Sequence, residues 1–213
     1  MFDETCNPKL YEDVKFFPGG NSLWEIASAA PFKYLLASGM RESSTVLDAG
    51  CGPLRVGRNL IMFLAPGNYC GLEPERTMID RGLLEPPLTP EIIDYKRPRF
   101  VSNSTFDIDG EFDIVLSNQV FFHCGREQLV TFLEKMRSHV LDSIVITVFI
   151  GEADADYHKS GFHEHFDYRF SSHGTIVYAE SSFRSLVAGC GYSAEPLGTT
   201  WMPFEQFWRL RKA

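Results

Sequence analysis

The segment from Val46 to Arg58 constrains the fold of this chain more than any other part of the sequence. It reads V-L-D-A-G-C-G-P-L-R-V-G-R, which is a short apolar run, a turn with two glycines, and the start of a helical pattern. Glycine lets a backbone approach a ligand where a Cβ would collide. A strand that enters such a turn and leaves it as a helix is typical of the ligand-binding edge of a parallel α/β sheet.

The rest of the chain repeats this alternation of strand and helix. We expect strands over 44–50, 69–72, 100–101, 112–116 and 143–150, and helices over 21–39, 55–64, 75–84 and 126–140. A helix over 181–188 and strands near 192–197 and 204–211 follow. Strands that alternate with helices form βαβ units. The pattern therefore predicts a doubly wound α/β domain with a mainly parallel sheet.

Length and cysteine usage limit the organisation and the compartment. The chain has 213 residues, of which 44% are hydrophobic and 23% charged, values that suit one globular domain. Its N-terminus lacks the basic and apolar regions of a signal peptide, and no window approaches 18 consecutive apolar residues. The five cysteines are odd in number and contain no C-x-x-C pair, which favours reduced thiols. We therefore expect a cytoplasmic protein that does not interact with membranes.

The charge balance bears on the partner. There are 20 Lys and Arg against 28 Asp and Glu, so the formal net charge is −8. A chain this acidic is repelled by phosphate backbones unless it carries a basic stripe, and the sequence contains none of sufficient length. Nucleic acid is therefore not expected as a partner, and a small-molecule substrate is favoured.

Charge also discriminates between the ligands that a glycine turn can bind. A nicotinamide fingerprint needs a third glycine where Arg55 stands, and the acid before the turn, Asp48, would repel a pyrophosphate. S-adenosylmethionine carries no phosphate and bears a positive sulfonium and a positive amine, so an acid suits it. Glu73, at the end of the next expected strand, stands where an acid can bind ribose hydroxyls. The turn therefore favours S-adenosylmethionine over a dinucleotide.

With these residues the sequence resembles the class I S-adenosylmethionine-dependent methyltransferases. Their first motif, (D/E)-x-G-x-G-x-G after a strand, matches Asp48, Gly50 and Gly52 and departs at Leu54. The resemblance implies a Rossmann-like fold: a seven-stranded sheet with helices on both faces and an antiparallel strand near the C-terminus. Leu54 stands in place of the third glycine, and it either crowds the methionine side of the pocket or reshapes the turn.

The resemblance also implies further cofactor contacts. Glu73 looks like the ribose-binding acid of the family. Asn103 and Phe106 fall where the family places its adenine contacts. Ser117 and Asn118 follow the fourth strand, where the family holds the methionine moiety. Together with Asp48, Gly50 and Gly52, these residues form the expected cofactor site.

The best-placed candidate for catalysis is His123. Methyl transfer from a sulfonium is an in-line displacement that needs alignment and exclusion of water, and a general base helps when the acceptor is a hydroxyl. His123 lies just past the fourth strand, and its pKa range suits a base. The alternative is a histidine that only orders the loop before the next helix.

Two segments outside the sheet are candidates for covering the site. Residues 152–175 are polar, aromatic and rich in histidine, and we expect a lid-like insertion whose Tyr157, His163 and His165 contact substrate. A metal site is not expected there, because the segment has neither a cysteine pair nor an H-E-x-x-H motif. Residues 1–40 are expected to form an N-terminal helical cap.

The sequence thus predicts one methyltransferase domain over residues 1–213. Its expected activity is methyl transfer from S-adenosylmethionine to an oxygen or nitrogen of a small or medium-sized molecule, with S-adenosylhomocysteine as product. A non-catalytic S-adenosylmethionine-binding domain and a nicotinamide-dependent oxidoreductase stay open as alternatives. So does the choice between a monomer and a homodimer.

Overall fold

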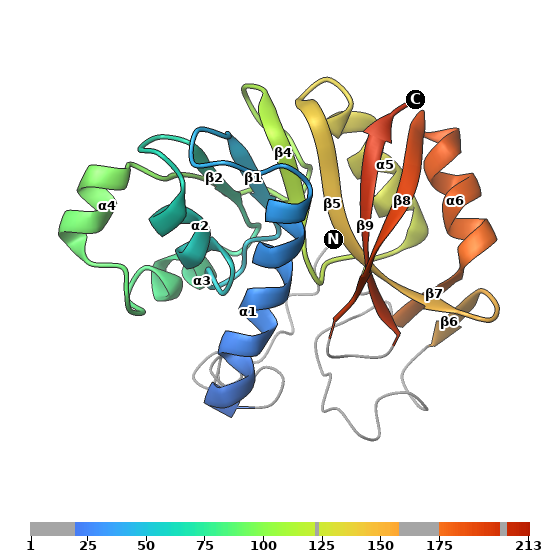
Figure 1. The fold of residues 1–213 in the computed structure, drawn as a ribbon, viewed down its shortest axis with the longest axis horizontal. Coiled ribbons are helices and arrows are strands. Elements are labelled where there is room, and N and C mark those ends of the chain that lie inside the picture. Colours follow the sequence, from blue (N-terminus) through green and yellow to red (C-terminus); the bar gives the residue numbers. More distant parts are fainter. Residues whose placement is uncertain (1–19, 122–123, 158–174, 201–203) are drawn as a thin grey trace.

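The computed structural model describes residues 20–121, 124–157, 175–200 and 204–213 (Figure 1). Six helices and nine strands lie in these ranges. The helices are α1 (Gly20–Ala37), α2 (Gly57–Phe63), α3 (Arg76–Gly82), α4 (Pro90–Lys96), α5 (Arg126–Met136) and α6 (Glu180–Gly189). The strands are β1 (Val46–Ala49), β2 (Tyr69–Leu72), β3 (Arg99–Val101), β4 (Phe112–Ser117), β5 (Val140–Gly151), β6 (Ala155–Tyr157), β7 (Thr175–Ala179), β8 (Tyr192–Thr199) and β9 (Glu205–Lys212).

The strands form a single mixed sheet. Its parallel part has the order β3-β2-β1-β4-β5. On the other side of β5, β9 pairs antiparallel with it, and β8 pairs antiparallel with β9. These seven strands make the expected doubly wound sheet, including its antiparallel strand near the C-terminus.

The remaining two strands extend this sheet at the carboxyl end of β5. Ile146 pairs with β4 on one side and with β9 on the other, whereas Phe149 pairs with β7 and β9. Hence β7 occupies the edge of β5 beyond the point where β4 ends. Its antiparallel partner β6 lies within the expected insertion 152–175. Sequence patterning missed both strands.

Helices cover both faces of the sheet (Figure 1). One face packs against α5 and α6, and its helical core residues are Leu129, Phe132, Leu133, Met136, Phe183 and Val187. The other face packs against α1, α2 and α3, and its helical core residues are Tyr34, Leu35, Leu60, Ile61 and Ile79. Burial of these apolar faces, at about 25 cal/mol per Å² of apolar surface, supplies the main driving force for folding.

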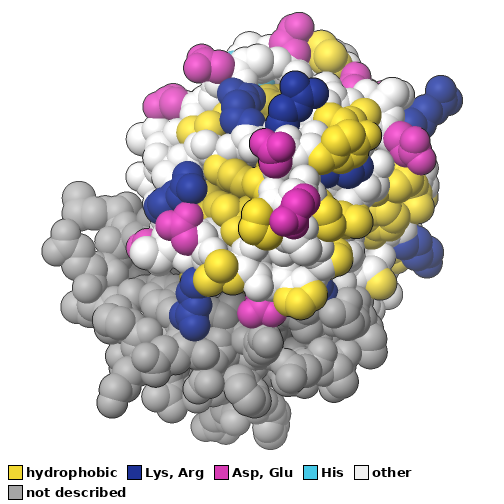
Figure 2. Space-filling model, turned by 90° about the vertical axis from the view of Figure 1, so that its left-hand side faces the viewer, with side chains coloured by type: hydrophobic (Ala, Val, Ile, Leu, Met, Phe, Trp, Pro, Cys, Tyr) yellow, Lys and Arg dark blue, Asp and Glu magenta, His cyan; other side chains and the backbone are white. Residues whose placement is uncertain are grey.

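The surface on the side of α2, α3 and α4 is mixed (Figure 2). Acidic and basic side chains are scattered among hydrophobic ones, and Leu84 and Tyr95 are among the exposed large hydrophobic residues. Within the described ranges, no helix is both long enough and apolar enough to cross a membrane.

Candidate functional site

The glycine turn lies at the carboxyl end of β1, between β2 and β4. Gly50 and Gly52 have φ values of +80° and +50°, in the left-handed region that favours glycine. The backbone N–H of Gly50 donates to the carbonyl of Leu72 at 2.7 Å, which ties the turn to the end of β2. A Cβ on Gly50 would lie 2.3 Å from Cγ2 of Val120, so the loop after β4 packs directly on this glycine.

Glu73 closes the other side of the turn. Its carboxylate accepts hydrogen bonds from the backbone N–H groups of Gly52, at 3.0 Å, and Glu75, at 3.1 Å. Burial raises the pKa of Glu73, and these two hydrogen bonds oppose the rise. The structure thus brings Glu73 and Gly52 together, as the expected cofactor site requires.

Asp48 lies beneath the turn and is almost completely buried. The hydroxyl of Tyr69 donates to its carboxylate at 3.0 Å. Burial raises the pKa of Asp48 to about 7; the Tyr69 hydrogen bond opposes the rise, the charge of Glu73 adds to it, and the charge of Arg55 opposes it. This acid therefore changes charge near neutral pH. Sequence reasoning missed Tyr69, because the two residues meet only once β1 and β2 have paired: Tyr69 lies opposite Val46, two residues before Asp48, and its hydroxyl reaches the Asp48 carboxylate.

Leu54 adopts the backbone conformation that a glycine would take at this position, with a φ of +59°. Its side chain is completely buried in the core around α2. Two glycines make room for it: a Cβ on Gly57 would lie 3.0 Å from Leu54 Cδ2, and one on Gly82 would lie 2.8 Å from Leu54 Cγ. The expectation that Leu54 crowds the methionine side of the pocket is therefore not supported, because its side chain points into the core.

The residues after β4 are tied to the strands on either side. The hydroxyl of Ser117, which is completely buried, donates to the carbonyl of Ala49 at 3.2 Å. Asn118 follows and is half-buried. Gln119 has a φ of +59°, an uncommon value for a residue with a side chain. Ser117 is thus tied to the end of β1, next to the glycine turn, and Asn118 directly follows it in the chain.

A buried polar cluster continues from this loop, and sequence reasoning missed it. Gln119 donates from its backbone N–H to the hydroxyl of Thr147 at 2.7 Å, and from its side-chain amide to Glu205 at 3.2 Å. The Arg55 guanidinium donates to the side-chain oxygen of Gln119, and the Thr200 hydroxyl donates to Glu205 at 2.7 Å. We call these five residues the Gln119 cluster. They come from distant parts of the chain, so no local pattern could have revealed them.

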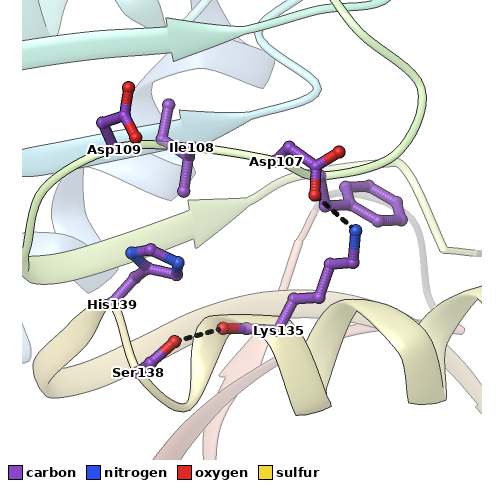
Figure 3. Close-up of a pocket in the computed structure, with 7 residues that line it drawn as sticks. Asp107, Ile108, Asp109, Lys135, Ser138 and His139 are labelled. Atoms are coloured by element: carbon purple, nitrogen blue, oxygen red, sulfur yellow. Dashed lines mark hydrogen bonds and ion pairs between the residues drawn. The ribbon is translucent and has the colours of Figure 1, made fainter.

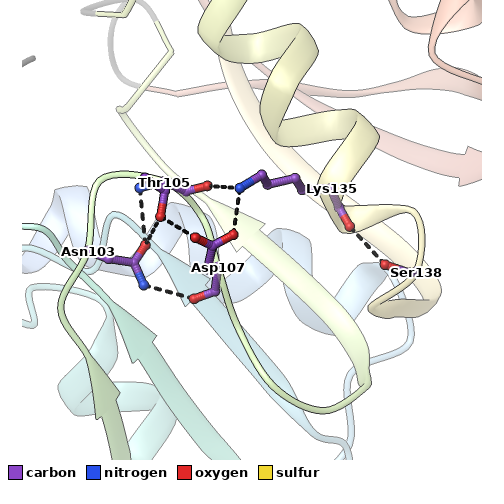
Figure 4. Close-up of polar contacts among 5 residues, drawn as sticks. All are labelled: Asn103, Thr105, Asp107, Lys135 and Ser138. Carbon is purple, nitrogen blue, oxygen red and sulfur yellow. Dashed lines mark hydrogen bonds and ion pairs between the residues drawn. The ribbon is translucent and has the colours of Figure 1, made fainter.

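The loop after β3 holds Asn103, but the side chain of Asn103 serves the loop itself (Figure 4). Its oxygen accepts from the backbone N–H of Thr105 at 3.2 Å, and its amide donates to the carbonyl of Asp107 at 2.8 Å. Lys135 of α5 holds the same loop through the Asp107 carboxylate, at 2.6 Å. The Asn103 oxygen also accepts from the Thr105 hydroxyl at 3.4 Å, and the three hydrogen bonds of its side chain leave Asn103 with a structural part in this loop.

The ring of Phe106 packs against two other rings, with centroid distances of 5.2 Å to Phe132 and 6.1 Å to Phe121. Beside it lies a pocket of about 310 Å³ between the loop and the end of α5 (Figure 3). Its lining residues are Phe106, Asp107, Ile108, Asp109, Lys135, Ser138 and His139. None of them belongs to the glycine turn or to the loop after β4, so this pocket is separate from the site described above.

Several expected residues lie outside the described ranges. They are His123, the candidate base, and His163 and His165 of the insertion. Tyr157 lies in β6, where its backbone pairs with Thr175. Within the part of the chain that the structure describes, no group of three or more His, Cys, Asp or Glu residues is arranged to hold a metal ion.

Three acids with raised pKa values lie at this edge of the sheet. Asp48, Glu73 and Glu205 are acids near the carboxyl ends of β1, β2 and β5, and burial raises the pKa of each. A cation brought close to them would favour their charged forms. Cys51 in the turn is not activated as a nucleophile, because burial raises the pKa of its thiol well above the usual range.

The chain was then compared with known proteins. No family model and no curated protein matches its sequence. Among solved structures, magnesium protoporphyrin IX methyltransferase from Synechocystis PCC 6803 with bound SAM is similar at a TM-score of 0.64 and 14% identity, over 99% of this chain and 87% of that one. The glycopeptide N-methyltransferase MtfA complexed with S-adenosyl-L-homocysteine has a TM-score of 0.67 and 10% identity, over 88% and 90% of the chains.

A third similar structure is the mitomycin 7-O-methyltransferase MmcR, with a TM-score of 0.66 and 16% identity, over 98% of this chain and 59% of that one. Identities this low establish likeness of fold, whatever each protein binds. The strand order, the helices on both faces and the antiparallel C-terminal pair agree with that likeness. The chain therefore has the Rossmann-like fold of the S-adenosylmethionine-dependent methyltransferases.

Proposed function

We propose that the protein is an S-adenosylmethionine-dependent methyltransferase that acts on an oxygen or nitrogen of a small or medium-sized molecule. One observation carries the proposal: the carboxylate of Glu73 is bonded to the backbone of Gly52, in a left-handed glycine turn directly above the buried acid Asp48. This arrangement offers a close backbone approach, an acid for ribose hydroxyls and negative charge for a cationic ligand. It suits S-adenosylmethionine better than a pyrophosphate.

The similar solved structures support the same proposal. All three are methyltransferases by name, and two of them contain S-adenosylmethionine or S-adenosylhomocysteine. One acts at nitrogen and one at oxygen by name, which is why we propose both acceptor atoms for this chain.

The residues present define what the protein would contribute. Glu73 would bind the ribose, and Gly50 and Gly52 would let the backbone approach the ligand. The carboxylate of Asp48 would balance the positive charge, and the loop of Ser117 and Asn118 would hold the methionine end. When bound, the cofactor supplies an electrophilic methyl group on its sulfonium. His123 remains our proposed base for removing the acceptor's proton.

Calorimetry with S-adenosylhomocysteine and with NAD, in parallel, tests the cofactor. We expect saturable binding of S-adenosylhomocysteine and none of NAD. Tight NAD binding without binding of the sulfur ligand would instead support a nicotinamide-dependent oxidoreductase and contradict our proposal.

A methyl-transfer assay tests catalysis. Tritium from methyl-labelled S-adenosylmethionine is followed over a panel of phenols, hydroxy acids and primary amines. We expect transfer to at least one class, and the His123→Ala variant should transfer more slowly at unchanged cofactor affinity. Binding of the cofactor without transfer to any acceptor would favour the non-catalytic binding domain.

The compartment, the domain organisation and the segments that cover the site complete the proposal. We propose a cytoplasmic, single-domain protein over residues 1–213, in which residues 1–40 and 152–175 cover the acceptor and Tyr157, His163 and His165 contact it. Limited proteolysis with and without S-adenosylhomocysteine tests the covering role, since a segment that closes over the ligand becomes protected from cleavage.

A further inference from the structure

The Gln119 cluster is a partly buried polar network that the proposed cofactor contacts leave unexplained. Arg55 follows the glycine turn directly, and Gln119 lies just beyond β4. Thr147 belongs to β5, Thr200 follows β8, and Glu205 begins β9. Because β9 runs antiparallel to β5, its first residue lies at the carboxyl end of the parallel strands. The cluster therefore joins four parts of the chain at the edge where open α/β sheets bind their ligands.

Gln119 is at the centre of the cluster and is held from three directions. Its backbone N–H bonds to β5, its side-chain oxygen accepts from Arg55, and its side-chain nitrogen donates to Glu205. Its φ of +59° costs a residue with a side chain about 1–2 kcal/mol. The surrounding hydrogen bonds maintain this conformation against its cost.

The conformation of Gln119 determines where the next residue lies. Val120 packs on the glycine turn, where its Cγ2 occupies the space that a Cβ on Gly50 would need. On the other side, Ser117 bonds to Ala49 at the end of β1. The loop after β4 is thus pressed against the proposed cofactor turn, and Gln119 is its only residue anchored to both Arg55 and Glu205 among those described.

Burying the carboxyl group of Glu205 in this position lowers the stability of the fold. It is completely buried, and its Oε2 accepts from both Gln119 and Thr200, whereas its Oε1 has no hydrogen-bond partner among the described residues. Burial raises the pKa of Glu205; hydrogen bonding with Thr200 and Gln119, the charge of Arg55 and the nearby Thr147 hydroxyl oppose the rise. A buried carboxyl with an unpaired oxygen destabilises a fold, so its presence at a ligand-binding edge suggests a functional role.

We propose that Glu205 and Arg55 are positioning residues of the cofactor site, which act through Gln119 to hold the loop after β4 against the glycine turn. The inference rests on the proposed function, because it assumes that this turn and this loop bind the methionine end of S-adenosylmethionine. Neither residue needs to touch the cofactor for this role.

Two substitutions of Glu205 test the inference by calorimetry with S-adenosylhomocysteine. Glu205→Ala removes the acceptor for Gln119 and Thr200, and we expect the Kd to rise roughly tenfold. Glu205→Gln retains one carbonyl oxygen that can accept from both donors, and we expect a rise of about threefold or less. Rescue by glutamine distinguishes hydrogen-bonded positioning from a general loss of packing.

Asp113 offers a matched control at the opposite end of the sheet. Its Oδ2 accepts from the backbone N–H of Thr45 at 2.7 Å and from the Thr45 hydroxyl at 3.1 Å, as Glu205 accepts from two donors. Asp113→Ala should lower the Tm and leave the Kd for S-adenosylhomocysteine unchanged. If Glu205→Ala proves insoluble, Gln119→Gly replaces it, since glycine adopts the left-handed conformation without strain and removes the anchored side chain. This variant should also show a roughly tenfold higher Kd.

The outcomes separate this inference from the proposed function. A wild-type protein that does not bind S-adenosylhomocysteine contradicts the proposed function itself. If the wild type binds it, a Glu205→Ala or Gln119→Gly variant with wild-type affinity overturns the positioning role alone. An equal loss in Glu205→Gln and Glu205→Ala also overturns it, because the retained oxygen would then have no effect.

Discussion

At the scale of single residues, Glu73 is the acid on which our proposed cofactor site depends most directly. Its two backbone hydrogen bonds already fix its orientation, so a bound ribose would gain hydrogen bonds without ordering the side chain first. We expect Glu73→Ala to weaken S-adenosylhomocysteine binding by about 1–3 kcal/mol, measured by calorimetry.

Its control is Glu75, an acid two positions away whose side chain caps α3 by accepting from the backbone N–H of Thr77. Glu75→Ala should cost about 0.5–2 kcal/mol of stability through the lost cap and leave the affinity unchanged. Unchanged affinity in Glu73→Ala as well would show that this acid does not bind the ribose.

Asp48 should link cofactor binding to the uptake and release of protons. Burial raises its pKa to about 7, so part of the protein carries a neutral Asp48 at neutral pH. A bound sulfonium and amine favour the charged carboxylate and so lower the pKa of Asp48. Each pKa unit of this decrease corresponds to about 1.4 kcal/mol of binding free energy. Affinity for S-adenosylmethionine should therefore rise as the pH increases from about 6 to about 8.

Calorimetry near pH 7, in two buffers of different ionisation enthalpy, measures the protons released on binding. Asp48→Asn keeps an oxygen that accepts from Tyr69, and it should abolish most of the release. Proton release that persists in this variant would assign the effect to Glu73 or Glu205, whose pKa values burial also raises.

At the scale of elements, the packing of α3 against the glycine turn depends on Gly82. A Cβ at this position would lie 2.4 Å from the backbone oxygen of Pro53, and backbone cannot move aside as a side chain can. We expect Gly82→Ala to lower the free energy of unfolding by about 1–3 kcal/mol and to weaken S-adenosylhomocysteine binding, because the turn must shift.

Gly189, the last residue of α6, provides the comparison. A Cβ there would meet nothing within 4 Å, so Gly189→Ala should be neutral or stabilising by up to about 1 kcal/mol, as alanine favours helix. Thermal unfolding of both variants gives the stabilities. A neutral Gly82→Ala would mean that the turn adapts without cost.

The helices and strands also show which element boundaries the sequence pattern predicts correctly. The pattern placed β2 over the residues that the structure shows, but it extended α5 to Val140, where β5 begins. Val140 lies four residues after Met136 and so fits the helical spacing, although it starts a strand. The pattern assigned no helix over 90–96, where α4 lies, although Pro90 in the first turn and the cap from Thr89 begin a helix there.

Some residues of the candidate site belong to local sequence motifs, whereas others come together only in the folded sheet. Asp48, Gly50, Gly52 and Glu73 belong to two short motifs, so local spacing was enough to find them. Gln119, Thr147 and Glu205 meet only after the sheet has formed, and their contacts depend on the register of β5 against β9. Asn103 was found as a candidate by its position, but position alone did not reveal the three hydrogen bonds that its side chain makes within its own loop.

At the scale of the whole molecule, the acids with raised pKa values gather at one edge of the sheet. Asp48, Glu73 and Glu205 come from β1, the end of β2 and the start of β9, and the strand order brings these ends together. Keeping several acids buried at one edge lowers the stability of the unliganded protein at neutral pH. A cationic ligand at that edge would restore this stability. As the pH rises, the stability of the unliganded protein should therefore fall while the affinity for the ligand should increase.

The contribution of Asp48 to the stability of the unliganded protein should therefore be lost as the pH rises from about 4 to about 7. A buried acid with a raised pKa binds its proton more tightly in the folded state than in the unfolded state. Its contribution to the free energy of unfolding is therefore complete at a pH below the pKa of the unfolded state, and it is lost as the pH rises through the pKa of the folded state. For Asp48, with a rise from 3.8 to about 7, the loss is on the order of 4 kcal/mol. Repulsion within a chain of net charge −8 acts in the same direction.

Thermal unfolding across this pH range, with and without S-adenosylmethionine, measures both effects. The Tm of the unliganded protein should fall towards pH 8, and Asp48→Asn should flatten the curve. The increase in Tm caused by saturating S-adenosylmethionine should be larger near pH 8 than near pH 5.5, because tighter binding stabilises the folded state more. A ligand-induced shift that is equal at both pH values would show that the buried acids do not face the cofactor's positive charge.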